Sequence, residues 1–209
     1  MTTWPRVLPY GESAYLVELG DTLDEGLAER ARALADRWKY GPAVPAYASV
    51  VLQYGASHDP ALADTRVARL LRTEGAQAAA RRPPRLIDIP TRYDGADLAE
   101  VAAMSKVSVD ELVKLHTGRE YTAFFLGFLP GWAYCGRLDP RIKAPRLESP
   151  RPRIAAGTVA VADGQTGVYP FPSPGGWRLI GTTDVAMFDP AREQPALLEA
   201  GDRVRFVAR

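Results

Sequence analysis

The residues best suited to binding a small polar ligand lie between positions 165 and 177. Gln165, in the segment DGQTGVYP, carries a carbonyl acceptor and an amide donor on one group, so it could bind the edge of a lactam or a urea. Gly175 and Gly176, in SPGGW, would let backbone N–H groups approach a ligand beside the flat face of Trp177. Each residue also has a structural interpretation, because Gln165 could cap a turn and Trp177 could fill a core.

Three arginines in the segment APRLESPRPR each stand next to a proline: Arg146, Arg151 and Arg153. Proline stiffens the backbone, which would aim the guanidinium groups in the geometry that favours carboxylates. The alternative is a set of surface ion pairs, which contribute about 0–1 kcal/mol each.

The segment 124–140, FFLGFLPGWAYCGRLDP, combines aromatic side chains with three glycines and two prolines. Tight turns would hold aromatics such as Phe128 and Tyr134 rigidly. Rigid aromatics make good contact surfaces because they lose little rotamer entropy on binding. The segment is therefore either an internal scaffold or one wall of a site that another chain completes.

His116 lies on the apolar face of a short predicted helix, three and four residues after Val113 and Leu112. It is either packed in the core or placed at the rim of a cleft, where the helix C-terminus would favour its protonated form. A nucleophilic pair of Cys135 with His116 is less favoured, because a free cysteine is more often a small buried apolar residue.

Composition excludes several other functions. With two histidines, one cysteine and neither H-E-x-x-H nor C-x-x-C, we expect no metal site. No G-x-x-x-x-G-K-[ST] is present, so we expect no cofactor and no ATP on this chain. The net charge of +1 argues against nucleic acid. The start lacks a signal-peptide pattern and no apolar run reaches the ~18–20 residues of a membrane span, so we expect a cytoplasmic protein.

The first part of the chain predicts a β-α-β-α order, with strands over 13–19 and 46–54 and helices over 22–41 and 58–76. Thr22 and Glu25 form a candidate capping box for the first helix, which Gly41 would end. Asp59 would cap the second helix, with Pro60 at its first position. With one further strand, this order makes a small α/β sandwich.

Pro83-Pro84 breaks this pattern, so we place a domain boundary there and predict domains over 1–82 and 83–209. The second part begins with a strand over 86–90 and helices over 97–105 and 108–118. Ser108 and Glu111 form a capping box in the latter, and Gly118 stops it. Between Gly127 and Gly181, 17 of 55 residues are glycine or proline among short β-like runs, which indicates a compact barrel or sandwich.

The long run GFLPGWAYCGRLDPRIKAPRLESPRPRIAAGTVAVADGQTGVYPFPSPGGWRLIGTT resembles the signature of the allophanate hydrolase subunit 1 family. Its members are also called 5-oxoprolinase B subunits and, in one branch, the sporulation histidine-kinase inhibitor. The resemblance extends over 110–121 and 188–207, and more loosely to the start of the chain. It therefore covers nearly all of the sequence.

The resemblance implies an α+β protein: a small N-terminal α/β sandwich followed by a cyclophilin-like β-barrel. It also implies partners, namely a homologous larger subunit, of the type called allophanate hydrolase subunit 2 or the 5-oxoprolinase C subunit, and one further protein. The implied complex cleaves 5-oxoproline to glutamate and uses ATP.

On this hypothesis the chain supplies part of a lactam-binding site that its partner closes. The expected catalytic groups are Gln165, Arg153 and His116, with donors placed near the developing oxyanion. The expected substrate-binding residues are Phe128, Pro130, Tyr134, Arg146, Tyr169, Gly175, Gly176 and Trp177. The alternative is a regulatory module that docks on a histidine kinase. Peptidyl-prolyl isomerisation would follow from the fold name alone, and fold does not imply function.

Overall fold

The computed structural model describes residues 3–54, 60–72 and 83–209, and of residues 60–64 only the backbone. The chain forms two compact units, Met1–Pro83 and Pro84–Arg209. Within the described residues, no helix combines the length and the apolar character needed to cross a membrane.

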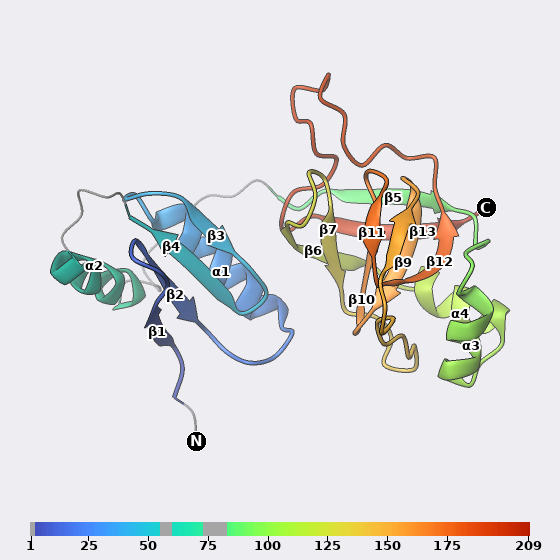
Figure 1. The fold of residues 1–209 in the computed structure, drawn as a ribbon, viewed down its shortest axis with the longest axis horizontal. Coiled ribbons are helices and arrows are strands. Elements are labelled where there is room, and N and C mark those ends of the chain that lie inside the picture. The colour runs from blue at the N-terminus through green and yellow to red at the C-terminus, as the bar shows by residue number, and fades with distance from the viewer. Residues whose placement is uncertain (1–2, 55–59, 73–82) are drawn as a thin grey trace. The chain divides into compact units, whose positions relative to one another are not determined.

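The first unit contains a four-stranded antiparallel sheet in the order β1-β2-β4-β3 (Figure 1). Its strands are β1 (Arg6–Pro9), β2 (Ala14–Glu18), β3 (Ala43–Pro45) and β4 (Ser49–Gln53). Strands β2 and β4 confirm the two predicted strands. The predicted β-α-β-α order is incomplete, because the two edge strands β1 and β3 were not foreseen. Every residue of β1 is exposed, so β1 lacks the alternation of buried and exposed residues that marks a strand, and β3 has only three residues, too few to show a period.

Helix α1 (Glu25–Arg37) packs against β3 and β4 over a core that includes Leu34 and Leu52. The predicted cap at Thr22 is wrong: the helix begins after Asp24, whose Oδ1 accepts a hydrogen bond from the Leu27 N–H at 3.1 Å. The helix also ends before Gly41. Helix α2 (Pro60–Arg72) begins at the predicted proline, and the predicted cap Asp59 lies outside the described residues.

The second unit is built on a seven-stranded sheet in the order β12-β9-β10-β7-β6-β13-β5 (Figure 1). These strands are β5 (Leu86–Thr91), β6 (Tyr121–Leu126), β7 (Ala133–Gly136), β9 (Thr158–Ala162), β10 (Gln165–Val168), β12 (Arg178–Thr182) and β13 (Arg203–Ala208). Strands β8 (Arg151–Ile154) and β11 (Ser173–Gly175) form a separate antiparallel ribbon.

The two ends of the seven-stranded sheet meet. Arg92, just after β5, and Thr182 of β12 exchange two backbone hydrogen bonds of 2.8 Å. A Cβ at Gly181 would lie 2.4 Å from the Arg92 carbonyl oxygen, so only glycine permits this approach. The sheet is therefore nearly closed and barrel-like, which confirms the predicted barrel in this coarse form.

Helices α3 (Leu98–Ser105) and α4 (Val109–Thr117) pack against β12 and β13, respectively. The Ser108 hydroxyl accepts from the Glu111 N–H, and Gly118 caps the end of α4, as predicted. Alternate residues of β9 enter two different cores. Val159 and Val161 join the large core under the helices, whereas Ala160 and Ala162 join a smaller aromatic cluster. That second cluster carries the candidate site.

Candidate functional site

Four aromatic residues cluster on the face of the sheet that carries Ala160 and Ala162: Trp132, Tyr134, Tyr169 and Trp177, together called the aromatic face. Trp132 lies at the centre, with ring centroids 4.6 Å from Tyr169, 5.0 Å from Trp177 and 5.7 Å from Tyr134. Trp132, Tyr169 and Trp177 are buried, whereas Tyr134 is half-buried. Three of the predicted binding residues, Tyr134, Tyr169 and Trp177, are thus brought together, but only Tyr134 offers much accessible surface.

Arg146, also predicted to bind substrate, lies at the edge of this face. Its guanidinium carbon is 5.7 Å from the centroid of Trp177, within the range of a cation–π contact. Its Nε donates to Oδ2 of Asp163 at 2.8 Å, and about half of its side chain is exposed to solvent. A charged group is therefore held beside an aromatic surface while it remains accessible.

The two tyrosine hydroxyls of the face are kept protonated. Burial raises the pKa of Tyr169, although a backbone hydrogen bond from Trp177 and the nearby Arg146 act in the opposite direction. Burial likewise raises the pKa of Tyr134, again opposed by Arg146. At neutral pH both hydroxyls can donate hydrogen bonds.

Gly175 and Gly176 differ in how tightly the surrounding atoms pack against them. A Cβ at Gly175 would lie 2.2 Å from the Tyr169 hydroxyl, so the glycine is required for the tyrosine to fit. At Gly176 a Cβ would meet nothing closer than 3.7 Å, and the Gly176 carbonyl accepts from the Leu147 N–H at 2.8 Å. Gly176 could therefore carry a methyl group in ordinary van der Waals contact with Leu147 and Pro150, whereas Gly175 could not.

Gln165 lies on the same side of the sheet as the aromatic face. In the strand register it stands opposite Ala162 on β9 and Gly136 on β7, and Tyr134 is two residues from Gly136. Its side chain is buried in this chain, with 5% exposure. Arg153, on β8, is exposed, and the described residues include no hydrogen-bond or ion-pair partner for it. Register thus brings Gln165 to the aromatic face, whereas Arg153 is exposed on the separate β8–β11 ribbon.

His116 lies in the large core and not at the rim of a cleft. Its side chain has no exposed surface, and its ring packs 4.5 Å from that of Phe206. Nε2 lies 2.9 Å from Oγ1 of Thr166, and Nδ1 lies 2.7 Å from the hydroxyl of Tyr93. Burial lowers the pKa of His116 to about 3. Of the two interpretations from sequence, the structure favours the packed histidine.

The hydrogen bonds around His116 fix its tautomer. The Thr166 hydroxyl donates to the Ala160 carbonyl at 3.1 Å, so it accepts from Nε2–H of the histidine. Nδ1 must then accept from the Tyr93 hydroxyl. Every polar atom of the ring is satisfied within the fold.

Cys135 is enclosed as well, and burial raises the pKa of its thiol to about 12. The thiolate that a nucleophilic pair with His116 would require is therefore not formed at neutral pH. Among the described residues, no group of three or more His, Cys, Asp or Glu side chains is placed to hold a metal ion.

The loop between β6 and β7 presents Phe128 to solvent. Its side chain is 58% exposed, and its backbone has φ = 71°, a left-handed conformation that is unusual for a bulky residue. Hydrogen bonds from Leu129 N–H to the Gly127 carbonyl and from Trp132 N–H to the Leu129 carbonyl close the loop. Phe128 also meets Trp132 edge to face at 5.9 Å. Pro130, at the same loop, is exposed.

Sequence reasoning missed the residues that hold this region together. Trp132 was not singled out, although it lies in the quoted aromatic segment. Asp97 is buried and binds Arg151 (Oδ1 to Nη2, 2.6 Å) and the Leu179 N–H (Oδ2, 2.7 Å), which ties the β8–β11 ribbon to β12. Nothing local in the sequence predicts a contact between residues 54 positions apart. Asp163, the partner of Arg146, was missed too, although the dipeptide Asp163-Gly164 is a turn signal that can be seen in the sequence.

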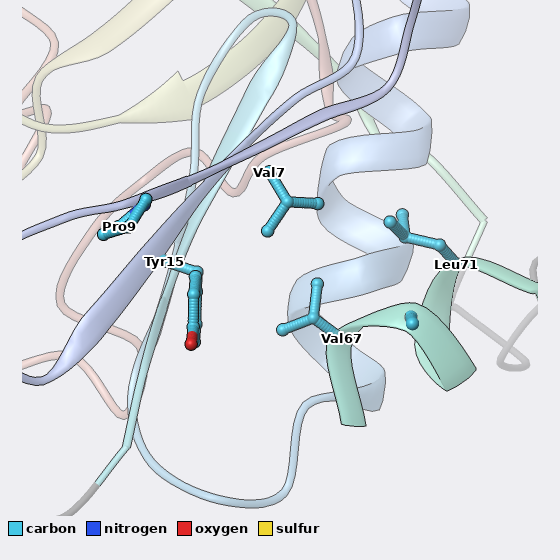
Figure 2. Close-up of a pocket in the computed structure, with 6 residues that line it drawn as sticks. Val7, Pro9, Tyr15, Val67 and Leu71 are labelled. Atoms are coloured by element: carbon cyan, nitrogen blue, oxygen red, sulfur yellow. The ribbon is translucent and has the colours of Figure 1, made fainter. Parts of the chain in front are cut away.

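A separate groove lies in the first unit, between the strand pair β1–β2 and helix α2 (Figure 2). It has a volume of about 370 Å³ and is lined by Val7, Pro9, Tyr15, Val67, Ala68 and Leu71. The side chains of Val7 and Val67 point toward one another across it (Figure 2). Apart from the hydroxyl of Tyr15, the lining side chains are apolar, so the groove offers mainly apolar contact surface.

Comparisons with known proteins show the family of the chain. Residues 5–198 match the family described as carboxyltransferase domain, subdomain C and D. The chain is 36% identical over 225 residues to the 5-oxoprolinase B subunit of Bacillus subtilis, covering 99% of this chain and 94% of that protein. It is 40% identical over 204 residues to the 5-oxoprolinase B subunit of Escherichia coli O157:H7, covering 94% and 93%, respectively.

Among solved structures, the chain is similar to TTHA0988, with a TM-score of 0.80 and 39% identity. The similarity covers 94% of this chain but only 40% of TTHA0988, so the chain spans less than half the length of that protein. The arrangement described above is thus found elsewhere as one portion of a longer polypeptide.

Proposed function

This chain belongs to the family of the carboxyltransferase domain, subdomain C and D, and is similar to 5-oxoprolinase B subunits, so we propose that it is one component of an ATP-dependent 5-oxoprolinase. The observation that carries the proposal is the similarity to two B subunits over 94% or more of this chain, which includes both compact units. A subunit needs companions. We place beside it a larger homologous protein of the C type and one further protein.

The reaction is the opening of a stable lactam amide. In the proposed chemistry, ATP transfers its terminal phosphoryl group to the lactam oxygen, which makes the ring carbon a better electrophile. One water then opens the C–N bond and a second releases the phosphate, so that glutamate, ADP and phosphate leave. We assign ATP binding to another component of the complex, in agreement with the expectation from sequence that this chain binds no cofactor.

The aromatic face would hold the lactam in this scheme. Tyr134 is half-buried and its hydroxyl stays protonated, so it can donate to the carbonyl oxygen of the lactam. Gly176 is not packed as tightly as Gly175, and Gln165 stands on the same side of the sheet as the aromatic face. Arg153 remains a proposed donor, because it is exposed and without a partner among the described residues. His116 has no place in the scheme, because its ring is fully enclosed.

The Phe128 loop would contact the companion protein. A bulky residue in the left-handed region costs about 1–2 kcal/mol, and such strain is common where a side chain is used for binding. An exposed aromatic side chain on a closed loop has the character of an interface anchor. TTHA0988, in which this fold continues into a longer chain, supports the idea that the fold works next to further protein.

Co-purification followed by an activity assay tests the proposal. The chain is co-expressed with candidate partners of the larger C type, and the purified complex is given 5-oxoproline and ATP. We expect a stable complex that releases glutamate and phosphate together. A complex that forms but releases no glutamate, or a chain that instead inhibits a histidine kinase in a phosphorylation assay, would contradict it.

A further inference from the structure

Arg146 combines three properties of a ligand-binding group. It is accessible, since about half of its side chain is exposed. It is positioned, since it lies over Trp177 and its Nε is bound to Asp163. Its two terminal nitrogens carry four N–H donors, for which the described residues provide no acceptor.

The backbone on both sides of Arg146 is anchored. The carbonyl of Pro145 accepts from Nε of Arg178 at 3.1 Å, and the Leu147 N–H donates to the Gly176 carbonyl at 2.8 Å. The carbonyl of Ala144, two residues before Arg146, accepts from the backbone N–H of Asp163 at 3.0 Å. The arginine and the aspartate are therefore held together by main-chain bonds as well as by their side chains.

Asp163 owes its position to a tight turn. It links β9 and β10 together with Gly164, and the two residues have φ = 49° and φ = 81°. Two successive positive φ values are typical of a type I′ hairpin turn, which favours Asp-Gly and Asn-Gly. The turn directs the carboxylate to Nε of Arg146, and so leaves the opposite edge of the guanidinium for another acceptor.

We propose that Asp163 is a positioning residue that presents the terminal nitrogens of Arg146 to the carboxylate of a small cyclic acid bound at the aromatic face. The fork of an arginine matches the two oxygens of a carboxylate. The adjacent half-buried Tyr134 would meet the ring of the ligand. The identification of that acid as 5-oxoproline rests on the proposed function, whereas the carboxylate site itself does not.

A pair of probes isolates the contribution of the carboxylate: 5-oxoproline and 2-pyrrolidone, which has the same lactam ring without the acid. Binding to the full chain is followed by NMR titration. The variants are Arg146→Gln, which removes the fork, and Asp163→Asn, which removes the ion pair but keeps a residue that tolerates positive φ. Asp88→Asn is the matched control, since Asp88 forms another exposed pair with Arg205 on β13.

We expect the wild-type chain and the Asp88→Asn variant to prefer the acid about tenfold, as a charged hydrogen bond would give. Arg146→Gln should abolish the preference, and Asp163→Asn should reduce it about threefold to fivefold. Equal binding of both probes by the wild type overturns the carboxylate site. An unchanged preference in Asp163→Asn overturns the positioning role.

The same variants in the complex separate this inference from the proposed function. If the complex releases glutamate and Asp163→Asn leaves KM for 5-oxoproline unchanged, the inference fails and the proposed function stands. If the complex has no oxoprolinase activity but the chain still prefers the acid through Arg146, the proposed function fails and the carboxylate site stands. A raised KM with little change in kcat in Asp163→Asn supports both.

Discussion

The Nε of Arg146 lies 2.8 Å from Oδ2 of Asp163, although the two residues stand on different segments, 17 positions apart. The aspartate belongs to a hairpin turn and the arginine to the segment between β7 and β8. Together they place a positive charge at the edge of a wall of aromatic rings. This relationship is the basis of the proposed carboxylate site on a face that otherwise offers mainly packing.

The two adjacent glycines should differ in their tolerance of alanine. Gly175→Ala would drive a methyl group to 2.2 Å from the Tyr169 hydroxyl, so we expect a loss of about 1–3 kcal/mol in the free energy of unfolding. Gly176→Ala meets only ordinary contacts and should stay within about 1 kcal/mol of the wild type. Urea denaturation of both variants measures the difference, and equal midpoints would contradict the tight fit of Tyr169.

His116 should make the stability of the fold depend on pH. Its pKa falls from 6.5 in the unfolded chain to about 3 in the folded one. The unfolded state therefore binds the extra proton between these values, so stability is complete above about pH 6.5 and falls as the pH drops towards 3. The slope for one such group is about 1.4 kcal/mol per pH unit.

Unfolding free energies measured between about pH 7 and pH 4 check this, with His116→Gln as the comparison. The variant should be less stable than the wild type at neutral pH, because the packing is disturbed, but its stability should decline less steeply with acid. Parallel pH profiles for the two proteins would show that His116 is not the group responsible.

Phe128 should matter more for assembly than for folding. Phe128→Gly relieves the left-handed strain at φ = 71°, so the stability of the isolated chain should remain within about 1 kcal/mol of the wild type. Loss of the aromatic anchor should weaken binding to the companion protein at least about tenfold, as measured by titration calorimetry. Val109→Ala, at another partly exposed apolar residue, serves as the control. An unaltered affinity would remove the loop from the interface.

Gln165 should matter for turnover. If it donates to the developing oxyanion, Gln165→Ala in the complex should lower kcat by about 100-fold to 1,000-fold, the usual loss for one such donor. Assembly, followed by size-exclusion chromatography, should be intact. Because Gln165 is buried, thermal unfolding of the variant must first show that the fold is retained. Normal turnover in a folded variant would exclude Gln165 from the chemistry.

The elements with strong local signals could be predicted from the sequence. The capping serine and the terminal glycine of α4, the strands β2 and β4 and the proline at the start of α2 all depend on neighbours in the chain. The first helix shows the limit of such signals. Thr22 and Asp24 are both residue types that favour the N-cap position, and in the structure the cap is Asp24.

The site was less predictable, because its contacts are long-range. Sequence alone could pick Tyr134, Tyr169 and Trp177 as special, but not that Trp132 would pack among them. The sequence left His116 open, and only its place between Tyr93, Thr166 and Phe206 decides that it is packed. The clamp of Asp97 on Arg151 crosses from the N-terminus of α3 to β8, a distance along the chain that no local pattern encodes.

Glutamate release under omission of single components tests the central claim most directly. The complete complex, this chain alone and the companion proteins alone are each supplied with 5-oxoproline and ATP. The account predicts turnover only when all are present, because the aromatic face with Arg146 is one half of the site. Release of glutamate by this chain alone, or by the companions without it, would contradict that account.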